Sequence, residues 1–364
     1  MTDTQHTPSL DESRVEAFAG QVMTDFAGAS GTAMTLLGDR LGLYQAMTGA
    51  GPVTAEKLAA GTGLHPRLVT EWLRHQAVSG YVTVDGDTFE LPMEHAAVLS
   101  VVDSPAYVIG VADIINGTYL TLDKLAAAFR GDGGVALDEM PGCTFHGIER
   151  FFRTAYVHQI AQTWFPAVPG LTALLSAGAK VADVGCGHGF ASRLVAQTWP
   201  ASTVVGFDFH APSIATARAQ TIEAGGPANV SFHVSDARDI AASSGAPFDV
   251  VVFFDSLHDL GDPPAALRAA YEALADGGIL VAVEPWSADR FTDTIGNPMA
   301  RANYAASTSL CTPGSLSQPG AYGLGTQGGP TRRIELIEAA GFANAHVAAD
   351  TGFNLVLTGT KRAG

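Results

Sequence analysis

Residues 181–189 read Val-Ala-Asp-Val-Gly-Cys-Gly-His-Gly, an apolar stretch that runs into three glycines at alternating positions. The stretch 181–184 is typical of a buried parallel strand, and the glycines allow a tight turn that brings the backbone close to a ligand. The dinucleotide-binding pattern Gly-x-Gly-x-x-Gly requires a third glycine where Phe190 stands. The loop therefore predicts a nucleoside site without a diphosphate, the alternative being an ordinary strand-to-helix turn.

Acidic residues follow at intervals that fit the ends of successive strands. Asp208 ends the stretch 203–208, and Asp236 follows the stretch 230–235. Ligands of open α/β sheets bind at the carboxyl ends of the strands, where a carboxylate commonly holds a ribose diol. We therefore expect Asp208 at a ribose and Asp236 at an adenine amino group. Asp183 would repel a phosphate and favour a cationic ammonium group, so the pattern points to S-adenosylmethionine.

From about residue 165 to the C-terminal end, the chain resembles the class I S-adenosylmethionine-dependent methyltransferases. The resemblance implies an α/β fold with a Rossmann-like, seven-stranded sheet, in which 278–284 is the fifth strand and 353–360 a late antiparallel strand. It also implies that S-adenosylhomocysteine is the product of the cofactor. The expected cofactor-binding residues are Asp183, Gly185, Cys186, Gly187, His188, Asp208, Phe209, Asp236, Ala237, Phe254 and Asp255.

The N-terminal part predicts a winged helix. Residues 53–77 read as two helices joined by a glycine turn, and Asp85-Gly86 between alternating apolar residues indicates a hairpin. Residues 51–91 hold three basic and five acidic residues, and the whole chain has a net charge of −16, so a nucleic-acid partner is disfavoured. The layout resembles small-molecule O-methyltransferases of plants and actinobacteria, which implies a homodimer paired through this domain.

We expect three regions along the chain. Residues 1–92 hold N-terminal helices and the winged-helix dimerisation domain, 93–168 a helical region roofing the acceptor pocket, and 169–364 the methyltransferase domain. Helical stretches are expected at 104–129 and 148–165. The segment 286–330, rich in Gly, Pro, Ser, Asn and Thr, is predicted to be an irregular, lid-like insertion, the alternative being disorder in the free enzyme. The candidate acceptor contacts are Tyr156, His158, Trp286, Asn303, Tyr304 and Cys311.

His258 follows the fourth expected strand, within Leu-His-Asp at 257–259. A neutral imidazole near pH 7 is able to take a proton from a phenol or similar group. In the winged-helix O-methyltransferases that the chain resembles, such a segment carries the general base, and the acid that matches Glu284 helps to orient it. The alternative is that His258 only packs near the cofactor, since Leu260 stands where tryptophan often follows the His-Asp pair.

The whole chain most resembles an actinobacterial group of winged-helix methyltransferases, on the strength of His188, 208–210, 309–313 and 315–318. This implies methylation of a small organic acceptor, most simply at oxygen, in natural-product biosynthesis. Two alternatives stay open: a non-methylating enzyme that binds the same cofactor, such as a pericyclase or decarboxylase, and a winged-helix transcriptional regulator.

Composition sets further bounds. No apolar run approaches the roughly 18 residues of a membrane span, and residues 1–14 are polar and mildly acidic, so we expect a cytoplasmic protein without a membrane partner. The three cysteines are widely spaced and odd in number. This pattern predicts no disulfide framework, and no His and carboxylate spacing indicates a metal site.

Overall fold

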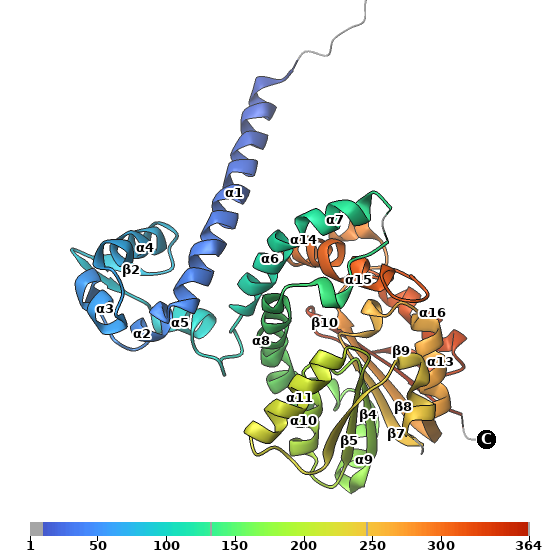
Figure 1. Ribbon diagram of the computed structural model, residues 1–364. Helices are drawn as coiled ribbons and strands as arrows, with labels where there is room; N and C mark the ends of the chain where they lie inside the picture. The colour runs from blue at the N-terminus through green and yellow to red at the C-terminus, as the bar shows by residue number, and fades with distance from the viewer. Residues whose placement is uncertain (1–9, 132, 245–246, 363–364) are drawn as a thin grey trace, which may run out of the picture. The chain divides into compact units, whose positions relative to one another are not determined.

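The computed structural model describes residues 10–131, 133–244 and 247–362, which form two compact units, one ending at Asn116 and one beginning at Gly117 (Figure 1). Residues 1–9, part of the polar start of the chain, lie outside the described residues. Across the described ranges, no helix combines the length and the apolar character that crossing a membrane requires. The three regions bounded at 92 and 168 stay a prediction.

The first unit begins with the long helix α1, whose N-terminus is capped by the Asp11 side chain through the backbone N–H groups of Ser13 and Arg14. A hairpin with Gly86 at φ +57° follows two short helices, which confirms the predicted winged helix. Its three strands have the order β1-β3-β2. The elements are α1 (Glu12–Arg40), α2 (Leu43–Met47), β1 (Val53–Thr54), α3 (Ala55–Thr62), α4 (Pro66–Val78), β2 (Thr83–Asp85), β3 (Thr88–Glu90) and α5 (Met93–Leu99).

Several helices follow the winged helix in the sequence and precede the first strand of the large sheet. The stretch predicted at 104–129 is two helices separated at Thr121, and the stretch predicted at 148–165 starts earlier and ends in a π-helical turn. The elements are α6 (Gly110–Leu120), α7 (Leu122–Phe129), η1 (Leu137–Glu139), α8 (Gly142–Gln159), η2 (Ile160–Trp164) and α9 (Leu171–Gly178).

The second unit is built on a seven-stranded sheet of order β6-β5-β4-β7-β8-β10-β9, which confirms the predicted fold. Strands β4 to β8 run parallel to one another, and β10 runs antiparallel to both β8 and β9. The strands are β4 (Lys180–Val184), β5 (Thr203–Asp208), β6 (Val230–Val234), β7 (Phe248–Phe254), β8 (Leu274–Pro285), β9 (Ala343–Asp350) and β10 (Asn354–Thr360). The intervening elements are α10 (Phe190–Thr198), α11 (Ala211–Glu223), η3 (Ala237–Asp239), α12 (Ile240–Ser244), η4 (Leu257–Asp259), α13 (Pro263–Ala273) and α16 (Pro330–Ala339).

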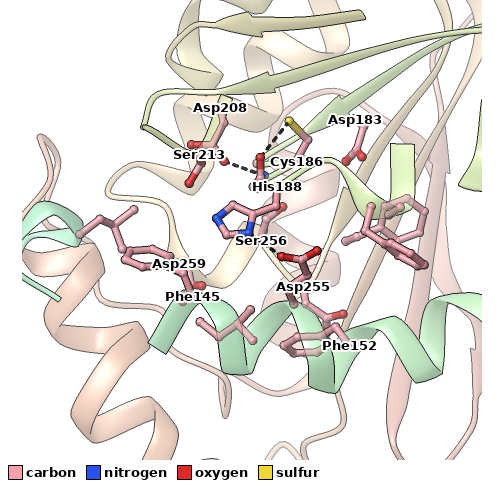
Figure 2. A pocket seen from close by; sticks show the side chains of 18 of the residues that line it. Phe145, Phe152, Asp183, Cys186, His188, Asp208, Ser213, Asp255, Ser256 and Asp259 are labelled. Carbon is pink, nitrogen blue, oxygen red and sulfur yellow. Dashed lines mark hydrogen bonds and ion pairs between the residues drawn. The ribbon is translucent and has the colours of Figure 1, made fainter. Parts of the chain in front are cut away.

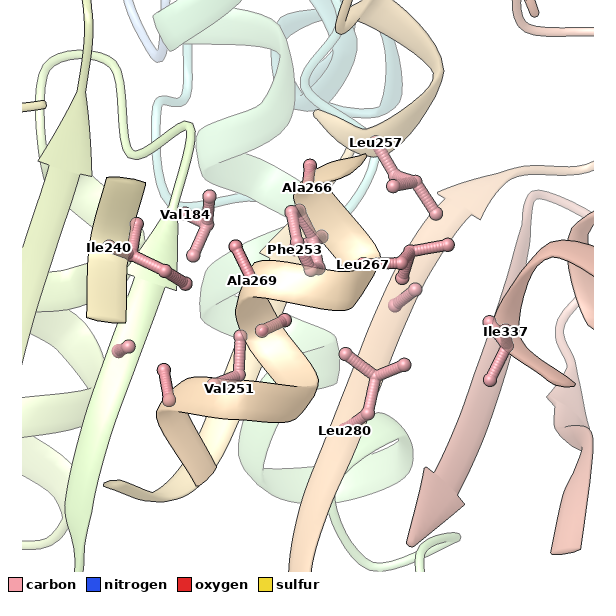
Figure 3. Close-up of a cluster of buried hydrophobic side chains, with 14 of the residues drawn as sticks. Val184, Ile240, Val251, Phe253, Leu257, Ala266, Leu267, Ala269, Leu280 and Ile337 are labelled. Carbon is pink, nitrogen blue, oxygen red and sulfur yellow. The ribbon is translucent and has the colours of Figure 1, made fainter. Parts of the chain in front are cut away.

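Helices bury both faces of this sheet. Successive residues of a strand point to opposite faces, so each strand contributes side chains to both layers. On β7, Val251 and Phe253 pack with α12, α13 and α16 (Figure 3), whereas Val250 and Val252 pack with η2, α9 and α10. This double cover explains why the strands read as continuous apolar runs. It also leaves the carboxyl ends of the strands as the place where polar groups gather.

About half of the segment 286–330 is helical, which corrects the expectation that the segment is irregular. Asn297 accepts hydrogen bonds from the backbone N–H groups of Met299 and Ala300, and Pro298 occupies the first turn. An asparagine cap followed by proline is a strong helix start, and it outweighs the glycine-rich and serine-rich composition. The elements are η5 (Phe291–Thr294), α14 (Pro298–Ala306), the π-helical turn η6 (Ser307–Cys311) and α15 (Thr312–Leu316).

Candidate functional site

A cavity of about 200 Å³ lies at the carboxyl ends of β4, β5 and β7 in the second unit (Figure 2). The glycine loop forms part of its wall, and residues of α8 form another part. The sequence-predicted residues that line it are Asp183, Gly185, Cys186, Gly187, His188, Asp208, Phe209, Phe254, Asp255 and Tyr156.

The glycine loop takes its shape from residues that tolerate positive φ. Gly185, Gly187 and Gly189 have φ values of +77°, +52° and +73°. A Cβ atom on Gly185 would also lie 2.6 Å from Cβ of Ser256. The resulting turn points the N–H of Gly187 at Oδ2 of Asp208, at 2.9 Å.

Asp208 is held at both of its carboxylate oxygens. Besides the bond from Gly187, its Oδ1 accepts a hydrogen bond from the backbone N–H of His210 at 2.8 Å. Burial raises the pKa of Asp208, and these two backbone bonds oppose that rise. The carboxylate is therefore fixed in orientation at the rim of the sheet, with its lone pairs only partly used.

Asp183 lies deeper than Asp208 and is 1% exposed. Ser192 Oγ donates a hydrogen bond to its Oδ2, and its Oδ1 has no hydrogen-bond partner among the described residues. Burial raises the pKa of Asp183 to about 7, with a further contribution from the nearby charge of Asp208. A buried carboxyl group with an unsatisfied oxygen beside a cavity suits a cationic ligand.

Asp236 and Ala237 do not line this cavity. They line a smaller space of about 20 Å³, which shares Phe209 with the larger one. Asp236 forms an ion pair with Arg238, whose Nη2 lies 2.7 Å from its Oδ2, and this hydrogen-bonded partner lowers the pKa of Asp236. The structure thus brings Asp183 and Asp208 together at one cavity and places Asp236 beside it.

Asp255 combines backbone strain with burial. Its φ is +49°, a rare value for a residue other than glycine, and its side chain is buried. Asn354 Nδ2 donates to its Oδ1 at 3.0 Å, whereas its Oδ2 makes no hydrogen bond within the part of the chain that is described. Burial raises the pKa of Asp255 well above its usual range.

His258 and Glu284 form a buried pair next to the cavity. The Nδ1 of His258 lies 2.8 Å from Oε2 of Glu284, and the N–H of Leu257 donates to Oε1 at 3.1 Å. Burial alone would raise the pKa of Glu284, but His258 and Arg333, whose Nε is 3.7 Å away, outweigh it and lower that pKa. Because an ionised Glu284 only accepts, Nδ1 of His258 carries a proton and Nε2 is the atom directed away from the pair. Burial alone would lower the pKa of His258, but the charges of Asp259 and Glu284 outweigh it and raise that pKa well above its usual range.

His258 itself does not line the cavity, whereas Asp259 does. The Nε2 of His258 is 3.2 Å from Oδ1 of Asp259, and the thiol of Cys311 interacts with both side chains. Burial raises the pKa of Cys311 to about 12. The sequence analysis missed this cluster, because Cys311 lies 52 positions beyond Asp259 and no local spacing links the two.

Another part of the wall is mostly apolar and comes from one face of α8. Phe145, Ile148, Phe152 and Tyr156 line the cavity, and only Tyr156 was singled out from the sequence as an acceptor contact. Their spacing of three or four residues was a usable signal, since it marks one face of a helix. Glu149, whose Oε2 lies 2.7 Å from Nδ1 of His188, also lines the cavity and was not predicted from the sequence. The other predicted acceptor contacts, His158, Trp286, Asn303, Tyr304 and Cys311, do not line this cavity.

Two families match separate parts of the chain. Residues 175–318 match the family described as methyltransferase domain, and residues 29–101 match the family described as Rv2258c-like winged helix-turn-helix domain. The ubiquinone biosynthesis O-methyltransferase of Pseudomonas fluorescens strain Pf0-1 is 35% identical over 102 residues, which cover 28% of this chain and 42% of that protein. The chain therefore spans less than half the length of the curated relatives that it matches.

Similar folds cover nearly the whole chain. Human N-acetylserotonin methyltransferase, solved in complex with S-adenosylmethionine, has a TM-score of 0.70 at 16% identity and covers 100% of both chains. Mitomycin 7-O-methyltransferase has a TM-score of 0.60 at 18% identity, covering 96% of this chain and 99% of that one. At these identities the likeness establishes the class I methyltransferase fold.

Proposed function

Because the chain carries a methyltransferase domain and a winged helix-turn-helix domain, we propose that it transfers a methyl group from S-adenosylmethionine to an oxygen atom of a small organic acceptor. The observation that carries this proposal is the composition of the cavity. Part of its wall is a glycine loop with the carboxyl groups of Asp183, which is buried, and Asp208, which is partly buried, and another part is the apolar and aromatic face of α8. The first suits a charged nucleoside and the second a planar organic molecule.

The cofactor would be held by the predicted residues around the glycine loop. Asp208 has the fixed orientation that a ribose diol requires, and Asp183 offers a carboxylate to a positive charge. Asp236 and Ala237, in the adjoining small space that Phe209 also lines, are proposed for the adenine. When bound, S-adenosylmethionine supplies the methyl group on a sulfonium centre.

Methyl transfer by in-line displacement needs alignment, exclusion of water and, for a weakly acidic acceptor, removal of a proton. The apolar face of α8, with Phe145, Phe152 and Tyr156, supplies alignment and dryness. We propose that Asp259, which lines the cavity and whose Oδ1 lies 3.2 Å from Nε2 of His258, takes the acceptor proton and passes it to that nitrogen. Glu284 keeps the imidazole in the tautomer that this role requires.

The test is a binding and turnover experiment on the purified chain. Titration calorimetry should show binding of S-adenosylmethionine, and a panel of phenols should include acceptors that yield S-adenosylhomocysteine. The matched variant is Asp208→Asn, which keeps the shape of the side chain and removes its charge. It should bind S-adenosylmethionine more weakly than the native chain. Lack of binding would sink the proposal, whereas binding with substrate turnover and no S-adenosylhomocysteine would favour the non-methylating alternative.

We further propose that the first unit pairs two copies of the chain and does not bind DNA. On α4, the helix placed to read DNA in a winged helix, both Arg67 and Arg74 form ion pairs with Glu71. On α1, Phe18, Met23 and Phe26 are more than 60% exposed, which favours a partner. Analytical ultracentrifugation should show that the native chain is a dimer and that the double variant Phe18→Glu, Phe26→Glu is a monomer. Gel shifts with duplex DNA should show no complex.

We also propose a cellular location and a pathway for the chain. None of the three cysteines forms a disulfide bond, which suits a reducing, cytoplasmic setting. A role in natural-product biosynthesis is proposed by analogy with similar folds, among them mitomycin 7-O-methyltransferase and a methyltransferase of calicheamicin biosynthesis. Fractionation of cells and metabolite profiling of a deletion strain test these two points.

A further inference from the structure

Three side chains that bind transition metals meet beside the cavity. One ligand atom each of His258, Asp259 and Cys311 lies within 4.8 Å of the other two. His258 and Asp259 come from η4, directly after β7, and Cys311 ends the π-helical turn η6 of the segment 286–330. Single π-helical turns are frequent at functional sites. We propose that these three residues bind a Zn²⁺ ion, and that the bound ion inhibits the proposed methyl transfer by occupying Nε2 of His258.

The spacing of the ligand atoms fits zinc. Nitrogen and oxygen ligands bind Zn²⁺ at about 2.0–2.1 Å, so two of them in a tetrahedral arrangement lie about 3.3 Å apart. The Nε2 of His258 and Oδ1 of Asp259 are already 3.2 Å apart. That oxygen is buried, and among the described residues neither Nε2 of His258 nor the nearby thiol of Cys311 makes a well-aligned hydrogen bond to it. A cation placed between the two atoms would satisfy both of them.

The surroundings supply the support that metal ligands usually have. Metal-bound histidine generally donates its second ring N–H to a carboxylate, which fixes the ring and the tautomer. His258 does this through Nδ1 to Oε2 of Glu284 at 2.8 Å, and Glu284 is itself held by Leu257 and Arg333. Nε2 is therefore the atom that the protein directs toward Asp259 and Cys311.

Ligand type selects the metal. A thiolate and an imidazole favour Zn²⁺ over Mg²⁺ or Ca²⁺, which prefer oxygen ligands. Binding releases the thiol proton of Cys311, and the resulting Zn²⁺, thiolate and carboxylate are neutral together, which suits a mostly buried place. Asp259 is the half-exposed ligand and lines the cavity, as do Leu260 and Leu310, the neighbours of the ligands. The fourth coordination position would therefore face the cavity.

The effect on turnover rests on the proposed function. A proton-accepting imidazole and a zinc-binding imidazole use the same lone pair of Nε2, so the two states exclude each other. Binding of the ion should therefore slow transfer to any acceptor whose proton His258 takes. Zinc binding itself does not depend on the reaction and is tested separately.

The binding test uses Zn²⁺ and Co²⁺ with the full-length chain. After dialysis, mass spectrometry should find one Zn²⁺ per chain, and Co²⁺ should give a thiolate-to-cobalt charge-transfer absorption band. Cys311→Ser should remove the band and the bound zinc, and Cys143→Ser, the matched control on α8, should keep both. If the wild-type chain binds no zinc above a protein blank, or if its cobalt spectrum lacks the band, the site does not exist, whether or not the Cys311 variant folds.

The turnover test compares chelated enzyme with enzyme carrying one equivalent of Zn²⁺. We expect the formation of S-adenosylhomocysteine to fall by roughly tenfold or more, since a general base commonly contributes at least that much, and to return on chelation. Equal or faster turnover with the ion bound would overturn inhibition and leave the binding result standing. If no turnover is detected in either form, the proposed function fails, and the cobalt spectrum still decides the metal site.

Discussion

The pH dependence of cofactor binding tests the role of Asp183. Its pKa is raised to about 7 mainly by burial, so at pH 6 only about a tenth of the free chain holds it ionised. If S-adenosylmethionine requires the ionised carboxylate, its affinity should rise about tenfold between pH 6 and pH 8, or about 1.4 kcal/mol, and level off above pH 7. Titration calorimetry at several pH values measures this change.

Asp183→Asn is the matched variant for that experiment. Asparagine keeps an oxygen that accepts from Ser192 and cannot ionise, and Asp208 is unchanged, so other titrations cancel in the comparison. The variant should bind S-adenosylmethionine more weakly at pH 8 and lose the tenfold dependence. An equal pH dependence in both proteins, or none in the native chain, would refute the assignment of Asp183 to the positive charge.

The raised pKa of Asp183 also makes the free energy of unfolding depend on pH. A carboxyl group whose pKa is raised in the folded state binds more protons there than in the unfolded chain between pH 4 and 7. The contribution of Asp183 to the free energy of unfolding is therefore fully present below about pH 4. It is lost as the pH rises through 7, at about 1.4 kcal/mol per pH unit between pH 4 and 7. Urea unfolding of the native chain without cofactor should show this loss relative to Asp183→Asn.

Three further changes test other contacts of the site. Asp208→Asn should weaken S-adenosylmethionine binding by about 1.5–3 kcal/mol, measured by calorimetry, because a charge-assisted hydrogen bond is lost; an unchanged affinity would remove Asp208 from the ribose. His258→Gln should lower turnover roughly 10²- to 10⁴-fold and leave cofactor affinity nearly intact, and full activity would make His258 a packing residue. Arg333→Met should lower the free energy of unfolding by about 3–5 kcal/mol in urea, since it leaves Glu284 buried without this cation; a loss under 1 kcal/mol would argue against that pairing.

Much of the fold was predictable because each part of it has a local signal. Strand β4 and the glycine loop form one continuous pattern, and Asp183 and Asp208 reach the same cavity because parallel strands end at the same edge of a sheet. The hairpin of the winged helix is fixed by Asp85-Gly86. Strand β9, which had no comparably strong signal, was not predicted.

The site was less predictable because side-chain partners decide where a residue points. Asp236 follows its strand as expected, but Arg238, two residues later, forms an ion pair with it outside the larger cavity. His258 was identified from its position, whereas its contact with Cys311 depends on how the helices of 286–330 pack. The aromatic face of α8 was visible as a helical pattern, but the pattern alone does not separate a core from a pocket wall.

Arg333 explains how the segment 286–330 is coupled to the His258 pair. Its fully buried guanidinium donates from Nη1 to the carbonyl of Pro285 at 3.1 Å, and from Nη2 to that of Thr326 at 2.8 Å, while its Nε faces Glu284. One cation thus holds both ends of the segment beside the carboxylate that orients His258. Arg333 also lowers the pKa of Glu284, together with His258. Loss of this cation should therefore have two effects at once. It should raise the pKa of Glu284, and it should release Pro285 and Thr326 at the two ends of the segment.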